Sequence, residues 1–90
     1  MSSKIVIPEE VKIKYIERRK KDLLDCRQAL SDLNFECFAH VGHQLKGNAI
    51  TFGFGELAPI GIEMEELALT KDIKNLTEVV NRFETYLNRI

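Results

Sequence analysis

His43-Gln44-Leu45-Lys46-Gly47-Asn48-Ala49 is the stretch around which the rest of this chain is organised. On a helix that turns about 100° per residue, this stretch continues an apolar stripe along one face. The members of the stripe are Phe38, Val41, Leu45, Ala49 and Phe52. Apolar residues at this spacing are typical of a helix face that is buried against other helices.

The opposite face of the same helix carries a different set of residues. His43, Gly47 and Ile50 fall on this outer face, and Lys46 lies at its margin, one turn after His43. The pattern therefore predicts an imidazole held in solvent, with a lysine one turn away and no side chain four residues on. This arrangement suits transient phosphorylation of a histidine.

The motif resembles the signature of histidine-containing phosphotransfer (HPt) domains. The resemblance rests on His43-Gln44-Leu45-Lys46-Gly47, on Ala49 and on Phe52-Gly53-Phe54, and it includes Met64-Glu65 in the next helix. It extends from about Pro8 to the end of the chain. It implies an HPt-like bundle of four helices and phosphoryl transfer through the Nε2 atom of His43.

The helix pattern, taken without the resemblance, also predicts an antiparallel four-helix bundle. We expect a short N-terminal arm at residues 1–7 and a single domain at 8–90. The expected helices cover residues 8–30, 33–52, 56–69 and 73–90, with N-caps at Asp32 and Asp72. Gly53-Phe54-Gly55 should end the second helix, and Pro59 suits the first turn of the third. The core positions of the last helix are Ile73, Leu76, Val80, Phe83, Leu87 and Ile90.

Length and charge narrow the possible classes of function. Ninety residues are enough for one small domain, and a net charge of −1 argues against binding to nucleic acid. No apolar run approaches the roughly 20 residues of a membrane span, so a cytoplasmic location is expected. Cys26 and Cys37 are expected to be free thiols, and nothing demands more than a monomer. A chain that begins with Met1 and ends in a last helical turn favours a stand-alone protein over a domain detached from a sensor kinase.

The residues near His43 have distinct expected roles. An exposed imidazole has a pKa of about 6.5, so at neutral pH it is mostly uncharged and nucleophilic. Lys46 can stabilise the charge of a phosphoryl group, and the absence of a side chain at Gly47 leaves room for that group. Gln44 can reach the phosphoryl group or a partner, or it can simply be solvated. The sequence does not show which residue orients the imidazole.

Apolar residues beside a reactive side chain suggest a docking surface for another protein. Ala39, His40, Ile50 and Phe54 are the candidate partner-binding residues. The first helix covering some of them is an equally open alternative. No metal site is expected, because Cys37, His40 and His43 are spaced by three residues and spread around the helix.

Two hypotheses for the function follow from these residues. In the first, the chain is a phosphorelay intermediate that takes a phosphoryl group from a receiver-domain aspartate onto His43 and passes it to another receiver. The resemblance implies receiver domains of response regulators or hybrid histidine kinases as partners, and it places Mg²⁺ on the receiver, so no cofactor is expected here. The chain has no ATP-binding region and is not expected to be an autonomous enzyme. In the second, the chain is an HPt-like scaffold that binds receiver or kinase domains without being phosphorylated.

Overall fold

The computed structural model describes residues 6–90, and those residues form four α-helices and no strand. The helices are α1 (Glu9–Asp32), α2 (Phe35–Asn48), α3 (Leu57–Thr70) and α4 (Ile73–Arg89). The predicted all-helical class is therefore confirmed. Of the predicted arm, residues 1–5 lie outside the described part of the chain, and residues 6 and 7 have no regular structure. The first helix begins at Glu9, one residue after the predicted start at Pro8. None of the helices within 6–90 combines the length and the apolar character needed to cross a membrane.

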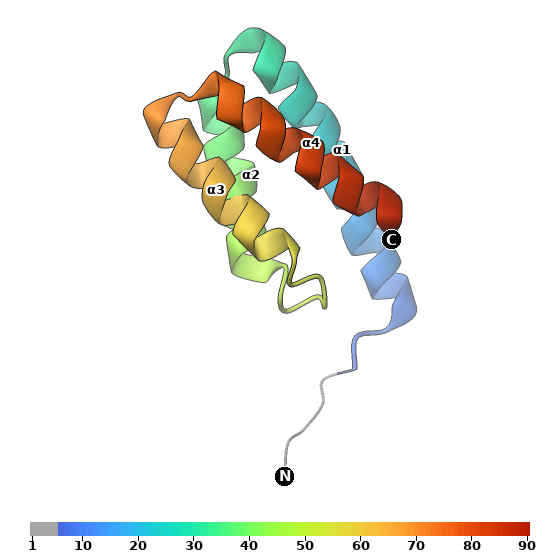
Figure 1. Cartoon of the computed structure of the whole chain (residues 1–90). Helices are drawn as coiled ribbons and strands as arrows, with labels where there is room; N and C mark the ends of the chain where they lie inside the picture. Colours follow the sequence, from blue (N-terminus) through green and yellow to red (C-terminus); the bar gives the residue numbers. More distant parts are fainter. Residues whose placement is uncertain (1–5) are drawn as a thin grey trace.

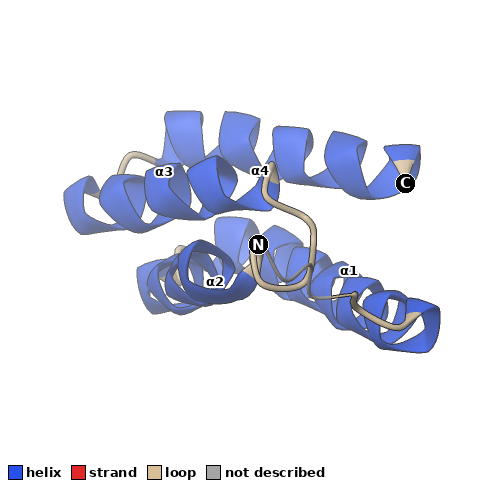
Figure 2. Ribbon diagram, turned by 90° about the horizontal axis from the view of Figure 1, so that it is seen from below, coloured by secondary structure: helices blue, strands red, loops and turns tan. Residues whose placement is uncertain are grey.

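The four helices form a bundle in which each helix packs against two neighbours. Contacts join α1 to α2, α2 to α3, α3 to α4 and α4 back to α1. Figure 1 shows α1 beside α4 and α2 beside α3, and Figure 2 shows α3 and α4 lying together over α1 and α2. The contact between α2 and α3 is the most extensive of the four. The motif helix α2 is thus held mainly by α3.

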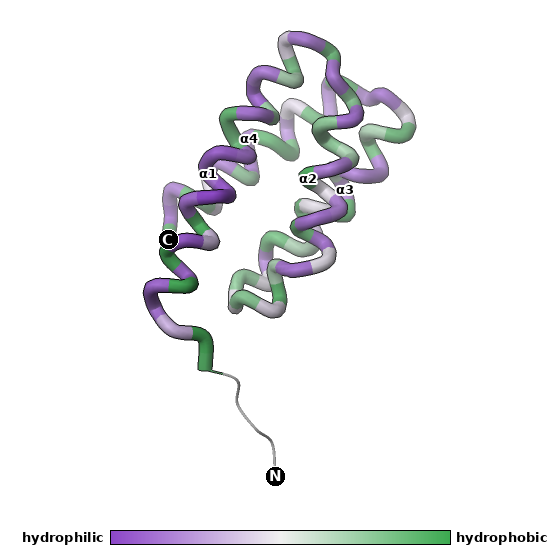
Figure 3. The backbone as a smooth tube through the Cα atoms, turned by 180° about the vertical axis from the view of Figure 1, so that it is seen from behind, coloured by the Kyte–Doolittle hydropathy of each residue, from purple (hydrophilic) through white to green (hydrophobic). Residues whose placement is uncertain are grey.

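Apolar side chains from all four helices fill the centre of the bundle. Hydrophilic and hydrophobic residues are interspersed along every helix, as amphipathic helices require (Figure 3). The buried apolar residues are Tyr15, Cys26, Ala29, Phe38, Val41, Leu45, Ala49, Leu57, Ala58, Ile60, Met64, Ala68, Leu76, Val79, Val80, Phe83, Tyr86 and Leu87. The predicted stripe of α2 is confirmed at its first four positions, and Phe52 is half-buried. In α4 the inner four predicted positions are buried, whereas Ile73 is half-buried and Ile90 is exposed.

The connection between α1 and α2 differs from the prediction by two residues. Helix α1 continues through Asp32, so Asp32 is not the N-cap of α2. Leu33 then adopts a left-handed conformation with φ 57°, and its N–H donates to Ala29 O. The cap of α2 is Asn34, whose side-chain oxygen accepts from the N–H of Cys37 at 3.3 Å. By contrast, the predicted cap of α4 is confirmed, because Asp72 accepts from the N–H of Asn75 at 3.1 Å.

Helix α2 ends at Asn48, four residues before the predicted end at Phe52. The chain then turns through residues 49–53, where Gly53 has a φ of 88° that favours glycine. This turn carries Phe52 and Phe54 back onto α1. Both rings stack on Tyr15, with centroid separations of 4.6 Å for Phe52 and 5.6 Å for Phe54.

Candidate functional site

His43 lies on the solvent side of α2, as predicted, and its side chain is 71% exposed. The helix positions it, because Val41 and Leu45 on either side of it are buried in the core. Its Nδ1 atom is 3.4 Å from Oε2 of Glu65 on α3. Of the two ring nitrogens, Nδ1 is thus the one that faces a partner within the chain.

Lys46 completes a three-residue cluster with His43 and Glu65. Its ammonium is 2.8 Å from the other carboxylate oxygen, Oε1 of Glu65, and its side chain is 43% exposed. The hydrogen bond from Lys46 lowers the pKa of Glu65 below its usual range, and the nearby His43 contributes in the same direction. Glu65 is therefore ionised at neutral pH, with one oxygen facing each of the two basic side chains.

The carboxylate of Glu65 favours one position for the proton of the His43 ring. An ionised carboxylate can only accept hydrogen bonds, so its place 3.4 Å from Nδ1 favours the tautomer that carries the proton on Nδ1. The lone pair is then on Nε2, the nitrogen farther from the backbone. In that tautomer Nε2 is unprotonated, and the ammonium of Lys46 lies one helical turn away.

The sequence does not assign a role at the site to Glu65. This residue belongs to the pair Met64-Glu65 in the resemblance, and the sequence does not show which residue orients the imidazole. The available signal was its place on α3 next to the buried Met64. Periodicity within one helix does not give the rotation of that helix relative to its neighbour, so it could not show that Glu65 faces α2.

The other two predicted phosphoryl-site residues are Gly47, which is exposed, and Gln44, which is half-buried. Gly47 is exposed, and a Cβ added to it would have no atom within 4 Å. Space beside His43 is therefore open, as expected. Gln44 is half-buried and faces the groove between α1 and α2, where it lies with Tyr15, Arg18, Asn48 and Phe52. Its role at the phosphoryl site stays a prediction.

The predicted docking residues divide into two pairs. His40 and Ile50 are exposed, and Ile50 retains 71% of its accessible surface. Ala39 and Phe54 are half-buried and pack against the core. The prediction placed Phe54 beside His43 on the outer face of the second helix. Because α2 ends at Asn48, Phe54 does not lie on that face.

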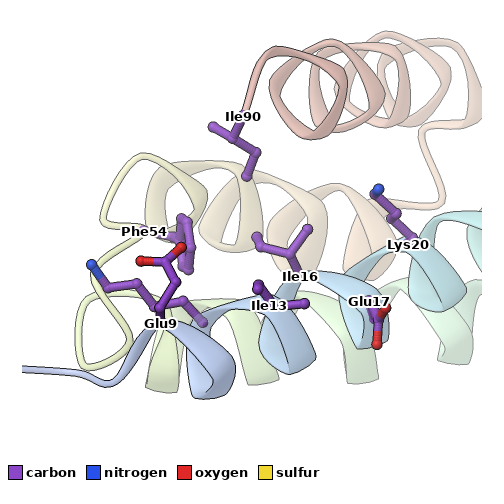
Figure 4. A pocket seen from close by; sticks show the side chains of 8 residues that line it. Glu9, Ile13, Ile16, Glu17, Lys20, Phe54 and Ile90 are labelled. Carbon is purple, nitrogen blue, oxygen red and sulfur yellow. The ribbon is translucent and has the colours of Figure 1, made fainter.

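Phe54 lines a pocket on the side of α1. The ring faces a hollow bordered by Ile13 and Ile16 of α1 and by the C-terminal Ile90, with charged residues at its rim (Figure 4). The first helix thus covers part of the predicted docking surface, which is the alternative that the sequence left open. Of the predicted apolar docking residues, Ile50 is exposed, whereas Ala39 and Phe54 are half-buried.

Tyr15 ties the end of α2 to α1. It is buried, its hydroxyl donates to Oδ1 of Asn48 at 2.7 Å, and burial raises its pKa. The guanidinium of Arg19 lies 4.5 Å from the ring centroid and is itself held by Asp22, with 2.7 Å between Nε and Oδ2. This network fixes the last turn of α2, which carries the end of the motif.

The two cysteines are free thiols, as predicted. Cys26 is buried, Cys37 is half-buried, and both are free. Burial raises the pKa of each thiol, which keeps both in the protonated form at neutral pH. Over residues 6–90, no three or more His, Cys, Asp or Glu side chains gather in a way that could hold a metal ion.

No protein-family model, curated protein or solved structure matches the chain.

Proposed function

We propose that this chain is a histidine phosphotransfer protein with an antiparallel, HPt-like bundle, and that His43 carries the phosphoryl group. It accepts the group from a receiver-domain aspartate and passes it to a second receiver. The observation that carries this proposal is the contact of Glu65 with Nδ1 of an otherwise exposed imidazole. This contact leaves Nε2 free to attack, in the helix context that the motif predicted.

No proton leaves the imidazole in the proposed transfer step. The lone pair of His43 Nε2 forms an N–P bond while the bond between phosphorus and the aspartyl oxygen breaks, and the aspartate leaves as a carboxylate. The ring becomes positively charged and keeps its proton on Nδ1. Glu65, ionised and 3.4 Å away, stabilises that positive charge. The reverse step returns the electron pair to Nε2, which suits an intermediate that passes the group on.

Lys46 supplies positive charge for the group in transfer. In the unphosphorylated chain its ammonium pairs with Glu65, and its flexible stem is 43% exposed. When the phosphoryl group arrives, the ammonium can turn towards the phosphoryl oxygens, because it lies one helical turn from His43. Phosphoryl transfer depends largely on positioning and on such charge stabilisation.

The receiver domain docks on the exposed face of α2 in this proposal. Gly47 leaves the approach open, and the exposed residues His40 on α2 and Ile50 in the turn after α2 are the docking contacts. Gln44 lines the groove between α1 and α2. The receiver brings Mg²⁺ and most of the catalytic groups, so this chain contributes the nucleophile, the lysine and the docking face.

The experiment that tests this function is transfer from receiver domains phosphorylated on their aspartate, with Mg²⁺ present. The chain should gain a label that is acid-labile and base-stable. The label should be lost in His43→Gln and kept in His40→Gln, the matched variant of the other exposed histidine. Receiver binding that survives His43→Gln, without label on the wild-type chain, would instead support the non-phosphorylated scaffold.

A further inference from the structure

Two glycines bring the backbones of α2 and α3 unusually close at one point. A Cβ built on Gly42 would lie 2.6 Å from the carbonyl oxygen of Gly61, and a Cβ on Gly61 would lie 2.6 Å from the carbonyl oxygen of Gly42. Each glycine thus turns a Cα–H towards the other's carbonyl, which is a recurring arrangement at close helix crossings. Both residues are buried, and a Cβ on Gly61 would also lie 2.6 Å from the Cβ of Leu45.

This crossing adjoins the candidate site on both helices. Gly42 precedes His43 in the sequence, and its Cβ would also lie 2.8 Å from the backbone nitrogen of Glu65. The Cβ of Gly61 would lie 2.8 Å from the backbone nitrogen of Lys46. The atoms that a methyl group would displace therefore include backbone atoms of Glu65 and Lys46, together with the Cβ of Leu45 in the core.

We infer that Gly42 and Gly61 are positioning residues, which set the distance between α2 and α3 so that Glu65 reaches Nδ1 of His43. The role of this contact in transfer rests on the proposed function, whereas the contact itself does not. A carbon atom and a carbonyl oxygen in contact are about 3.3–3.6 Å apart. Alanine at either glycine therefore forces the helices apart by several tenths of an ångström.

The contact with His43 has little tolerance for such a movement. The separation of Nδ1 and Oε2 is 3.4 Å, already longer than the roughly 2.7–3.2 Å of an ordinary N–H···O hydrogen bond. The ion pair between Lys46 and Glu65 is shorter, at 2.8 Å, and the long flexible side chain of Lys46 can follow a small movement of α3. Opening the crossing should therefore remove the imidazole contact first.

The test is the tautomer of neutral His43, read from ¹⁵N shifts of the imidazole in histidine-labelled protein. In the wild-type chain the Nδ1–H form should predominate. In Gly61→Ala and in Gly42→Ala its fraction should fall by at least half, to the level found in Glu65→Gln. Gly55→Ala is the matched control, because its Cβ would meet only Ile50 at an ordinary 3.8 Å, and it should keep the wild-type fraction.

A double variant separates positioning from a general disturbance of the fold. If the glycines act through Glu65, adding Glu65→Gln to Gly61→Ala changes the tautomer no further. A further change, an unchanged tautomer in both alanine variants, or failure of both to fold would each overturn the proposal. An altered tautomer without phosphorylation of the wild-type chain would refute the proposed function and leave the positioning role standing.

Discussion

Glu65 on α3 faces His43 on α2, with 3.4 Å between its Oε2 and the Nδ1 of the imidazole, and its second oxygen is 2.8 Å from Lys46. One carboxylate from a neighbouring helix thus contacts both basic side chains of the motif. In the proposed transfer, Glu65 orients the ring and stabilises the positive charge that the ring gains. The proposed chemistry of α2 therefore depends on α3.

The contact between Glu65 and Lys46 makes the stability of the chain depend on pH. Because the pKa of Glu65 is lowered in the folded chain, the ionised carboxylate stabilises the fold above the usual carboxyl pKa. This stabilisation is lost as the pH falls through the lowered value. Glu65→Gln should therefore reduce the free energy of unfolding more at pH 7 than at pH 3, as measured by urea denaturation. Glu66→Gln, at the next and exposed position, controls for the loss of one carboxylate.

Lys46→Ala should slow phosphoryl transfer to His43 while leaving the fold intact. The ammonium is partly exposed, so its interaction with the phosphoryl group is worth up to about 1 kcal/mol, or roughly a fivefold change in rate. Single-turnover transfer from a phosphorylated receiver measures this rate. Lys71→Ala, at the exposed end of α3, is the matched control. An unchanged rate in Lys46→Ala would remove the electrostatic role from this lysine.

Gly47→Ala should change stability and transfer in opposite directions. A Cβ at this position meets no atom within 4 Å, and alanine is favoured over glycine in a helix by about 0.5–1 kcal/mol. Thermal unfolding should therefore show a stabilised chain. Transfer should be slower, because the methyl group occupies space beside the imidazole that the proposal gives to the receiver. Faster or equal transfer would show that this glycine does not keep the approach open.

Tyr15→Phe should destabilise the chain without changing its helices. The variant loses the hydrogen bond to Asn48, which costs about 1 kcal/mol, and keeps the stacking with Phe52 and Phe54. Denaturant unfolding gives the loss, and a double-mutant cycle with Asn48→Ala isolates the bond itself. Additive effects in that cycle would show that the 2.7 Å contact contributes nothing to stability.

Much of the fold was predictable, because the spacing of apolar residues indicates which face of each helix is buried. The stripe of α2 and the cap at Asp72 follow directly from that spacing and from capping chemistry. The boundary between α1 and α2 was not predictable in this way. Leu33 takes a left-handed conformation that leucine rarely adopts, and this extends α1 past the predicted cap at Asp32, so that Asn34 caps α2.

The site was predictable only within one helix. The exposure of His43 and the open space at Gly47 follow from the period of α2. Two features depend on contacts between elements that are distant in sequence. Stacking on Tyr15 draws Phe54 away from the predicted docking face, and the close crossing of α2 and α3 brings Glu65 to the imidazole.

The most direct test of the account is the position of the phosphoryl group. Uniformly ¹⁵N-labelled chain is phosphorylated by a receiver domain, and the histidine ring nitrogens are observed by NMR together with ³¹P. The account predicts one phosphohistidine, at residue 43, bonded through Nε2 and with the proton retained on Nδ1. Phosphate on Nδ1, phosphate on His40, or no phosphohistidine with any receiver domain of the organism would contradict it.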